Sequence, residues 1–498
     1  MRRSIVAVLL GAVACYGVLA VTDPPGPGLD PDTMSYIGAA QSLARQHAFR
    51  IPMASWDDAD STTSLGHFPP GFSLVIAIPV ALGAAPVQAA RAVMALSAFA
   101  TVALAVWLVG GVAGAGAGAL AGLLLMVSPS FAFDHWQVIS EPLCLALLLA
   151  TLALMTRSAR PVTYGLAAAA AGIVRYAAVS ATGAVALWAW AQGGDVRARL
   201  RRAVVAAAPS VLLQTAWTVR TAIEAGELRS FGVRGSLGPS VRELAGTLGR
   251  WLAPLVPSGW VQALAAVAVV VAVGAVVASR RGAPRGTGEL AASRLVAAAG
   301  VLAACYAALV VFSRLFVDLT IPFDERLLSP FIVLVEVAAV AALGAAWARL
   351  RPKWRGVVAA AAALWLAASA VATFRAVRDA LDGGWGYASD EWRGSALGAW
   401  LRGPGRRYAL FSNNSATAFF LTGRPTRSLP ETLEPDSVSG FGEVLRARHG
   451  VLVRFPFDLE DVASPDSLAK RLGLIEMARF ADGLVWAAPA RGGRGGGP

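Results

Sequence analysis

Residues 1–20 have the sequence MRRSIVAVLLGAVACYGVLA, in which two arginines precede an unbroken apolar run. A segment of this kind is either the first helix of a membrane protein or a cleaved signal peptide. Many further apolar runs follow along the chain, which favours the first alternative. We therefore expect an uncleaved membrane helix whose arginine-bearing end lies in the cytoplasm.

The composition of the whole chain supports a membrane protein. Of its 498 residues, 56% are hydrophobic and only 15% are charged, and this balance is too apolar for a soluble protein of this length. The net charge of +12 comes from short Lys and Arg clusters between apolar runs, which is typical of cytoplasmic loops and excludes nucleic acid as a partner. Cys15, Cys144 and Cys305 lie in apolar segments without the spacing of metal ligands.

The basic clusters predict the topology by the positive-inside rule. The apolar runs of about spanning length cover residues 5–21, 89–109, 112–127, 139–155, 203–223, 260–277, 295–312, 327–347 and 357–372. The run 67–86 is bracketed by prolines, and a crossing there would place every later basic cluster outside, so we expect a helix on the outer surface. The run 162–190, interrupted by Arg175, should form a hairpin of two short helices with Arg175 near its outer turn.

These expectations define the fold class and the domains. Residues 1–373 should form a mostly α polytopic membrane bundle of about eleven spans, with a long first extracytoplasmic loop at residues 22–88. Residues 374–490 alternate strand-like and helical runs, such as ALFSNNSATAFFL (409–421) and HGVLVRF (449–455), and predict a small extracytoplasmic α/β domain. The glycine-rich residues 491–498 should be a disordered tail.

The predicted outer loops gather ionisable residues, which membrane proteins place at depth only for a site or a partner. Asp30 before Pro31 is a good helix N-cap, whereas Asp32 shares a helix face with Tyr36 and has no such explanation. Glu141 and Arg175 lie at or inside the membrane boundary and carry the most weight. For Glu141 the alternative is a carboxylate that complements a helix dipole.

Six short motifs, in this order, resemble the GT-C membrane glycosyltransferases, in particular the branch of protein O-mannosyltransferases and lipid A aminoarabinose transferases. The motifs are PDTMSY (31–36), HFPPGFSL (67–74), AARAVMALSAF (89–99), SEPLCLALLLATLAL (140–154), GIVRYAAV (172–179) and DERLLSPFIVL (324–334). The resemblance covers residues 1–373 in order and topology. It implies a bacterial inner (plasma) membrane enzyme that moves a sugar from a polyprenyl-phosphate donor to an extracytoplasmic protein, lipid or glycan acceptor.

The resemblance also implies roles for residues. The first-loop acid at Asp32 would be the general base, with Asp30 as the other candidate because the family often has an acidic pair where this chain has Asp32 and Thr33. Fixed positive charge would stabilise the leaving phosphate. The expected substrate-binding residues are Arg326 and Arg175, then Arg91, together with Tyr36, His67, Glu141 and Tyr176. The ordinary alternatives are snorkelling for Arg91 and a nearby acidic partner for Arg326.

Other functions also fit the sequence. A lipid-linked oligosaccharide transferase or a glycan ligase is the nearest alternative, and a membrane transporter is the alternative from another class. A transporter would be expected to carry mid-membrane ionisable groups and an internal repeat, and the sequence has neither. Glu141 could hold a divalent cation with Asp30 or Asp32, but His67 and His135 lack the spacing of a metal motif, so no metal ligand is assigned.

Overall fold

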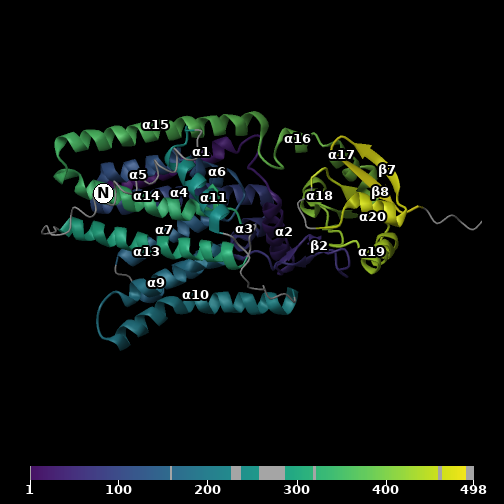
Figure 1. Cartoon of the computed structure of the whole chain (residues 1–498), viewed down its shortest axis with the longest axis horizontal. Coiled ribbons are helices and arrows are strands. Elements are labelled where there is room, and N and C mark those ends of the chain that lie inside the picture. Colours follow the sequence, from purple (N-terminus) through teal and green to yellow (C-terminus); the bar gives the residue numbers. More distant parts are fainter. Residues whose placement is uncertain are drawn as a thin grey trace, which may run out of the picture. The chain divides into compact units, whose positions relative to one another are not determined.

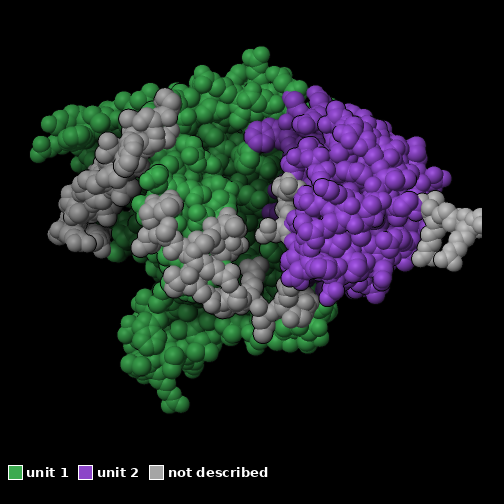
Figure 2. Space-filling view, turned by 45° about the vertical axis from the view of Figure 1, so that its right-hand side comes forward, with its two compact units in different colours: residues 1–27, 66–75, 87–382 green, residues 28–65, 76–86, 383–498 purple. Residues whose placement is uncertain are grey.

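The computed structural model of the chain describes residues 2–157, 160–225, 237–256, 287–317, 321–457 and 462–489. They form two compact units, which Figure 2 distinguishes by colour. The first unit comprises residues 1–27, 66–75 and 87–382, and the second comprises residues 28–65, 76–86 and 383–498. The predicted span at 260–277, the arginines that follow it at 280, 281 and 285, and the predicted tail at 491–498 lie outside the described residues.

The first unit consists of helices (Figure 1). They are α1 (Arg2–Val21), α4 (Pro86–Ala113), α5 (Ala115–Val127), α6 (Pro129–Trp136), α7 (Glu141–Thr156), α8 (Pro161–Val174), η1 (Tyr176–Val179), α9 (Ser180–Trp190), α10 (Val196–Ala225), α11 (Leu237–Leu252), α13 (Thr287–Phe316), α14 (Glu325–Ala346), η2 (Trp347–Arg349) and α15 (Pro352–Gly383), and α3 (Gly71–Ala81) begins in this unit.

Small residues let these helices pack closely, as is usual where lipid offers no hydrophobic driving force between helices. A Cβ on Gly165 of α8 would lie 2.2 Å from the Ala206 carbonyl oxygen of α10, so only glycine permits this approach. A Cβ on Gly118 of α5 would likewise lie 2.5 Å from the Val106 carbonyl oxygen of α4. The bundle is therefore held by backbone-to-backbone contact as much as by large side chains.

The lengths of the helices bear on the predicted topology. Within the described ranges, five helices are long and apolar enough to cross a membrane, namely α1, α4, α13, α14 and α15, and a sixth span results if the pair α5 and α6, bent by 62°, counts as one. Helices α3, α7 and α8 and the segment Tyr176–Trp190 are apolar but shorter. The chain is mostly helical as predicted, while the count of about eleven spans remains a prediction.

The second unit contains α2 (Pro31–Gln46) and two β-sheets. Its other helices are α16 (Asp390–Arg393), α17 (Ala396–Arg402), η3 (Pro404–Arg407), α18 (Ser415–Thr422), α19 (Pro435–Ala447) and α20 (Pro465–Leu472). Its strands are β1 (Arg50–Ile51), β2 (Met53–Ala54), β3 (Thr63–Ser64), β4 (Ala409–Ser412), β5 (Thr426–Arg427), β6 (Gly450–Arg454), β7 (Ile475–Phe480) and β8 (Gly483–Ala487). Strands β1 and β3 form an antiparallel pair.

The larger sheet has the strand order β2-β5-β4-β6-β8-β7. Its first four strands are parallel, and β8 and β7 continue it antiparallel. Because side chains alternate along a strand, Leu410 and Val451 face one apolar cluster, which includes Leu397 of α17. Phe411 and Leu452 face the opposite cluster, which includes residues of α19 and α20. Helices therefore cover both faces of the sheet.

The larger sheet also takes in a strand from the first loop. Met53 and Ala54 of β2 pair in parallel with β5. Arg427 is a buried residue, 4% exposed, and its guanidinium donates to the carbonyl oxygens of Ser55 (3.0 Å), Asp58 (2.6 Å) and Asp60 (2.6 Å). The unit thus differs from the predicted domain at residues 374–490, because first-loop residues belong to it and because α15 continues past residue 373 to Gly383.

Candidate active site

Three separate helix ends of the first unit meet at one buried carboxylate. Glu141 is the first residue of α7, where Ser140 precedes it as the N-cap. Arg175 is the C-cap of α8, at the break before η1. Arg326 lies in the first turn of α14, whose N-cap is Asp324. The structure therefore brings together three of the residues that the sequence predicted for substrate binding.

The Glu141 carboxylate binds both guanidinium groups. Its side chain is fully buried, and its Oε1 lies 2.7 Å from Arg175 Nη1 and accepts a hydrogen bond from Arg326 Nε. The Ser140 hydroxyl donates to Oε2 at 3.2 Å, and Arg175 Nη1 reaches the same hydroxyl at 3.4 Å. The two arginines keep 16% and 25% of their side chains exposed. One anion shared by two cations leaves this triad with one net positive charge.

Two further polar side chains border the triad, and the sequence reasoning assigned neither of them a role. Asp134 of α6 is fully buried next to Glu141, Arg175 and Arg326, and neither of its carboxylate oxygens makes a hydrogen bond of ordinary geometry. The Tyr306 hydroxyl of α13 donates to the Leu327 carbonyl oxygen at 2.8 Å and lies beside Arg175. No periodic pattern links these residues, because each comes from a different helix.

Asp324 fixes the start of α14. Its Oδ1 accepts the Leu327 N–H at 2.7 Å, which is ordinary N-capping. Burial raises the pKa of the Asp324 carboxyl above its ordinary value, and this hydrogen bond and the charge of Arg326 act in the opposite direction. Arg326 forms an ion pair with Glu141, and its charge also acts on Asp324. The cap holds Arg326 one residue inside the helix.

The first-loop acids lie in the second unit, at the start of α2. Asp30 is the N-cap: its Oδ1 accepts both the Thr33 N–H and the Thr33 hydroxyl at 2.7 Å, and the Thr33 hydroxyl also accepts the Asp30 N–H at 3.0 Å. This capping box gives Asp30 the structural role that the sequence predicted. Asp32 lies in the first helical turn and is partly exposed, and Tyr36 is buried.

The remaining predicted substrate-binding residues have other surroundings. Arg91 at the start of α4 donates to the Thr22 hydroxyl (2.9 Å) and the Leu19 carbonyl oxygen (2.6 Å) and lies 3.5 Å from Asp23, so it ties α4 to the end of α1. His67 is exposed, with its ring edge-on to Phe68. The Tyr176 hydroxyl accepts the Trp217 indole N–H at 3.0 Å.

No metal centre is apparent in the described ranges, where no three His, Cys, Asp or Glu side chains gather as metal ligands would. The buried acids Asp134 and Glu141 lie together, but Glu141 already holds two arginines. A divalent cation therefore has no assigned ligands in this part of the chain.

The fold is that of the GT-C glycosyltransferases, which confirms the resemblance inferred from the motifs. Two similar structures are those of ArnT from Cupriavidus metallidurans. The apo form has a TM-score of 0.63 at 16% identity, over 97% of this chain and 97% of its own. The form bound to undecaprenyl phosphate has a TM-score of 0.60 at 16% identity, over 97% of this chain and 98% of its own. The arabinofuranosyltransferase AftD from Mycobacteria has a TM-score of 0.54 at 15% identity, over 97% of this chain and 41% of its own.

Sequence comparisons add no closer relative. No protein-family model and no curated protein matches the chain. Since the structural neighbours share so little sequence, they establish the fold and leave the activity to be argued from the residues.

Proposed function

We propose that the protein is a glycosyltransferase that moves a sugar from a polyprenyl-phosphate donor to an acceptor outside the cytoplasm, in a bacterial inner membrane. The observation that carries this proposal is the triad of Glu141, Arg175 and Arg326, which holds two guanidinium groups on one buried carboxylate. The GT-C-like fold supports it, as does the presence of undecaprenyl phosphate in one ArnT structure of the same fold.

The reaction needs positive charge where the donor phosphate leaves. As the bond between the anomeric carbon and the phosphate oxygen breaks, negative charge builds on that oxygen, and arginine is well suited to bind it because it presents several donors in a fixed plane. Arg175 and Arg326 keep 16% and 25% of their side chains exposed, which leaves part of each guanidinium accessible to a bound phosphate. In this proposal they contact the phosphate, and Glu141 positions them.

The reaction also needs a base for the acceptor hydroxyl. That hydroxyl loses its proton as its oxygen forms the new bond to the anomeric carbon, and a carboxylate within hydrogen-bond reach can accept the proton. We assign this role to Asp32, because Oδ1 of Asp30 is engaged in the capping box of α2. The proposal also keeps Tyr36, His67 and Tyr176 as residues that contact the substrates.

The test is transfer by membranes that contain the full-length protein, supplied with a panel of radiolabelled polyprenyl-phosphate sugars. Asp32→Asn and Asp30→Asn remove one carboxylate each, and asparagine at residue 30 can still cap the helix. We expect Asp32→Asn to lose transfer about 100-fold or more and Asp30→Asn to keep most of it. Arg326→Gln should lose about 100- to 1,000-fold in rate, as when one charge-stabilising donor is removed.

The matched control is Arg378→Gln, which removes an exposed arginine of α15 that is paired only loosely, at 3.4 Å, with Asp382. It should transfer sugar like the wild type. Equal transfer by the wild type, Asp32→Asn and Arg326→Gln would refute both residue assignments. Wild-type membranes that transfer no sugar from any donor of the panel would refute the proposed activity.

A further inference from the structure

A second polar pocket lies at the other end of the helical bundle from Glu141. It has a volume of about 340 Å³ and is lined by residues of four helices, among them Arg3 of α1, Trp107 and Gly111 of α4, Arg157 at the end of α7, and Arg294 of α13. Helix α7 connects the two places, with Glu141 at its first residue and Arg157 as its C-cap. Its 16 residues span about 24 Å, so this pocket is separate from the triad.

The pocket is strongly basic. Three of its lining residues are arginines and none is acidic. No ion pair of Arg3, Arg157 or Arg294 occurs among the residues that the structure describes, although nearby Arg349 pairs with Glu289 at 2.7 Å. Arginines that line a cavity without carboxylate partners present their donors to an anion that enters it.

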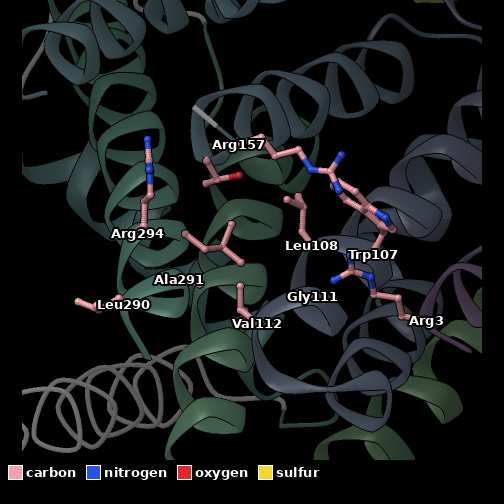
Figure 3. Close-up of a pocket in the computed structure, with 11 residues that line it drawn as sticks. Arg3, Trp107, Leu108, Gly111, Val112, Arg157, Leu290, Ala291 and Arg294 are labelled. Carbon is pink, nitrogen blue, oxygen red and sulfur yellow. The ribbon is translucent and has the colours of Figure 1, made fainter. Parts of the chain in front are cut away.

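Aromatic rings lie beside all three arginines; the Arg294 guanidinium is 5.8 Å from the centre of the Trp188 ring and donates to Gln192 Oε1 at 3.4 Å. The Arg157 guanidinium lies 3.6 Å and that of Arg3 5.8 Å from the centre of the Trp107 ring, and Figure 3 shows both beside this ring with Arg294 across the pocket. Gly111 leaves room for Arg3, because a Cβ there would lie 2.9 Å from Arg3 Nη1. Cation–π contacts orient a guanidinium without using its N–H donors. The arrangement therefore resembles a prepared anion site.

The rest of the lining indicates what kind of anion fits. Leu108, Val112, Leu290 and Leu295 add an apolar wall, which a free inorganic anion would not need. The volume falls in the usual range of small-molecule sites, about 300–1,000 Å³. By the positive-inside rule this end of the bundle lies at the cytoplasmic leaflet, where basic pockets between membrane helices meet anionic lipid headgroups.

We propose that this pocket binds the phosphate headgroup of an anionic phospholipid of the cytoplasmic leaflet. Arg157 and Arg294 bind the phosphate oxygens from opposite sides, Arg3 adds charge, and the apolar wall receives the start of the acyl chains. The bound lipid links the ends of α1, α4, α7 and α13. Activity at the proposed active site is not needed for this binding, so the two proposals can fail independently.

The experiment measures lipid binding to the purified full-length protein in detergent. Phosphatidylglycerol, phosphatidylcholine and inorganic phosphate are added separately, and native mass spectrometry and thermal unfolding record retention and stabilisation. We expect phosphatidylglycerol alone to be retained and to raise the Tm. The double variant Arg157→Gln/Arg294→Gln should bind it at least about tenfold more weakly, because it lacks two charge-assisted hydrogen-bond donors.

Two comparison variants make the test specific. Arg351→Gln/Lys353→Gln removes two exposed charges from a basic cluster of the same predicted side without touching the pocket, and it should bind the lipid like the wild type. Gly111→Leu keeps every arginine and fills the pocket beside Arg3, so it should weaken binding even if the glutamine pair does not fold.

Three results would overturn the proposal. Wild-type retention by both pocket variants would show that the lipid does not enter this pocket. An equal loss in the Arg351→Gln/Lys353→Gln control would show attraction by the general surface charge. Full stabilisation by inorganic phosphate, with no added gain from phosphatidylglycerol, would show that the ligand is a free anion.

Discussion

Replacing Glu141 by glutamine tests whether the triad is a coupled electrostatic unit. The substitution keeps the shape of the side chain and removes the single charge that Arg175 and Arg326 share. Breaking a buried ion pair by removing one partner costs about 3–5 kcal/mol, because the remaining charge is left without compensation. Here two guanidinium groups lose their ion pair with residue 141, but both retain contact with solvent. We therefore expect the free energy of unfolding to fall by about 3 kcal/mol, the lower end of this range.

The assay is unfolding of the purified protein in detergent micelles by a chemical denaturant, followed by tryptophan fluorescence. The control is Glu289→Gln, because the Glu289–Arg349 pair has the same 2.7 Å separation as Glu141–Arg175 but leaves 47% of the arginine side chain exposed. An exposed pair of this kind contributes about 0–1 kcal/mol. The two carboxylates therefore differ in burial, and Glu141 binds two arginines where Glu289 binds Arg349.

A double variant separates charge from packing. Glu141→Gln/Arg326→Gln removes the shared carboxylate and one of the two cations, so only Arg175 loses its ion pair with residue 141. We expect the double variant to be more stable than Glu141→Gln alone, because the effects of substitutions at interacting residues on the free energy of unfolding are not additive. If Glu141→Gln unfolds within about 0.5 kcal/mol of the wild type, or if the double variant shows the plain sum of the single losses, the electrostatic reasoning is wrong.

Three further changes test other parts of the structure. Arg427→Met should lower the free energy of unfolding of the second unit by about 3 kcal/mol, because three partly buried carbonyl groups lose a charged donor. The measurement is protease resistance of residues 50–64, and unchanged resistance would contradict this. Gly165→Ala should cost about 1–3 kcal/mol in thermal unfolding, whereas Gly183→Ala, with nothing within 4 Å of its new Cβ, should not destabilise. Asp30→Ala should lower the free energy of unfolding by about 0.5–2 kcal/mol in thermal unfolding, because alanine cannot cap α2. Asp30→Asn should lower it less, because asparagine can.

The sequence predicted best what depends on neighbouring residues. The N-cap at Asp30 follows from the local Asp-Pro pattern, and the structure has it. The break at Arg175 separates α8 from η1 and α9, as the interruption of the apolar run indicated. Strands β4 and β6 fall within the apolar runs that predicted strands, because short buried strands have a recognisable composition.

What the sequence could not provide is contact between distant segments. Nothing local links Glu141 to Arg326, which is 185 positions later in the chain, and a motif order cannot say that their side chains meet. Strand β2 has only two residues and no strand pattern of its own, so its place in the larger sheet is decided by β5. Asp134 and Tyr306 were given no role for the same reason, since burial beside the triad is a property of packing alone.

Strand β2, which comes from the first loop and joins the larger sheet, affects the order in which the protein can fold during synthesis. It also restricts which segments can be replaced. Ser55 and the Arg427 that binds it are separated by 372 positions, so a ribosome releases the early strand long before its partner exists. That loop must await the last part of translation before it acquires its final neighbours. Residues 383–498 therefore cannot be exchanged for those of another protein by themselves. The first-loop residues that pair with them, including β2, would have to be exchanged at the same time.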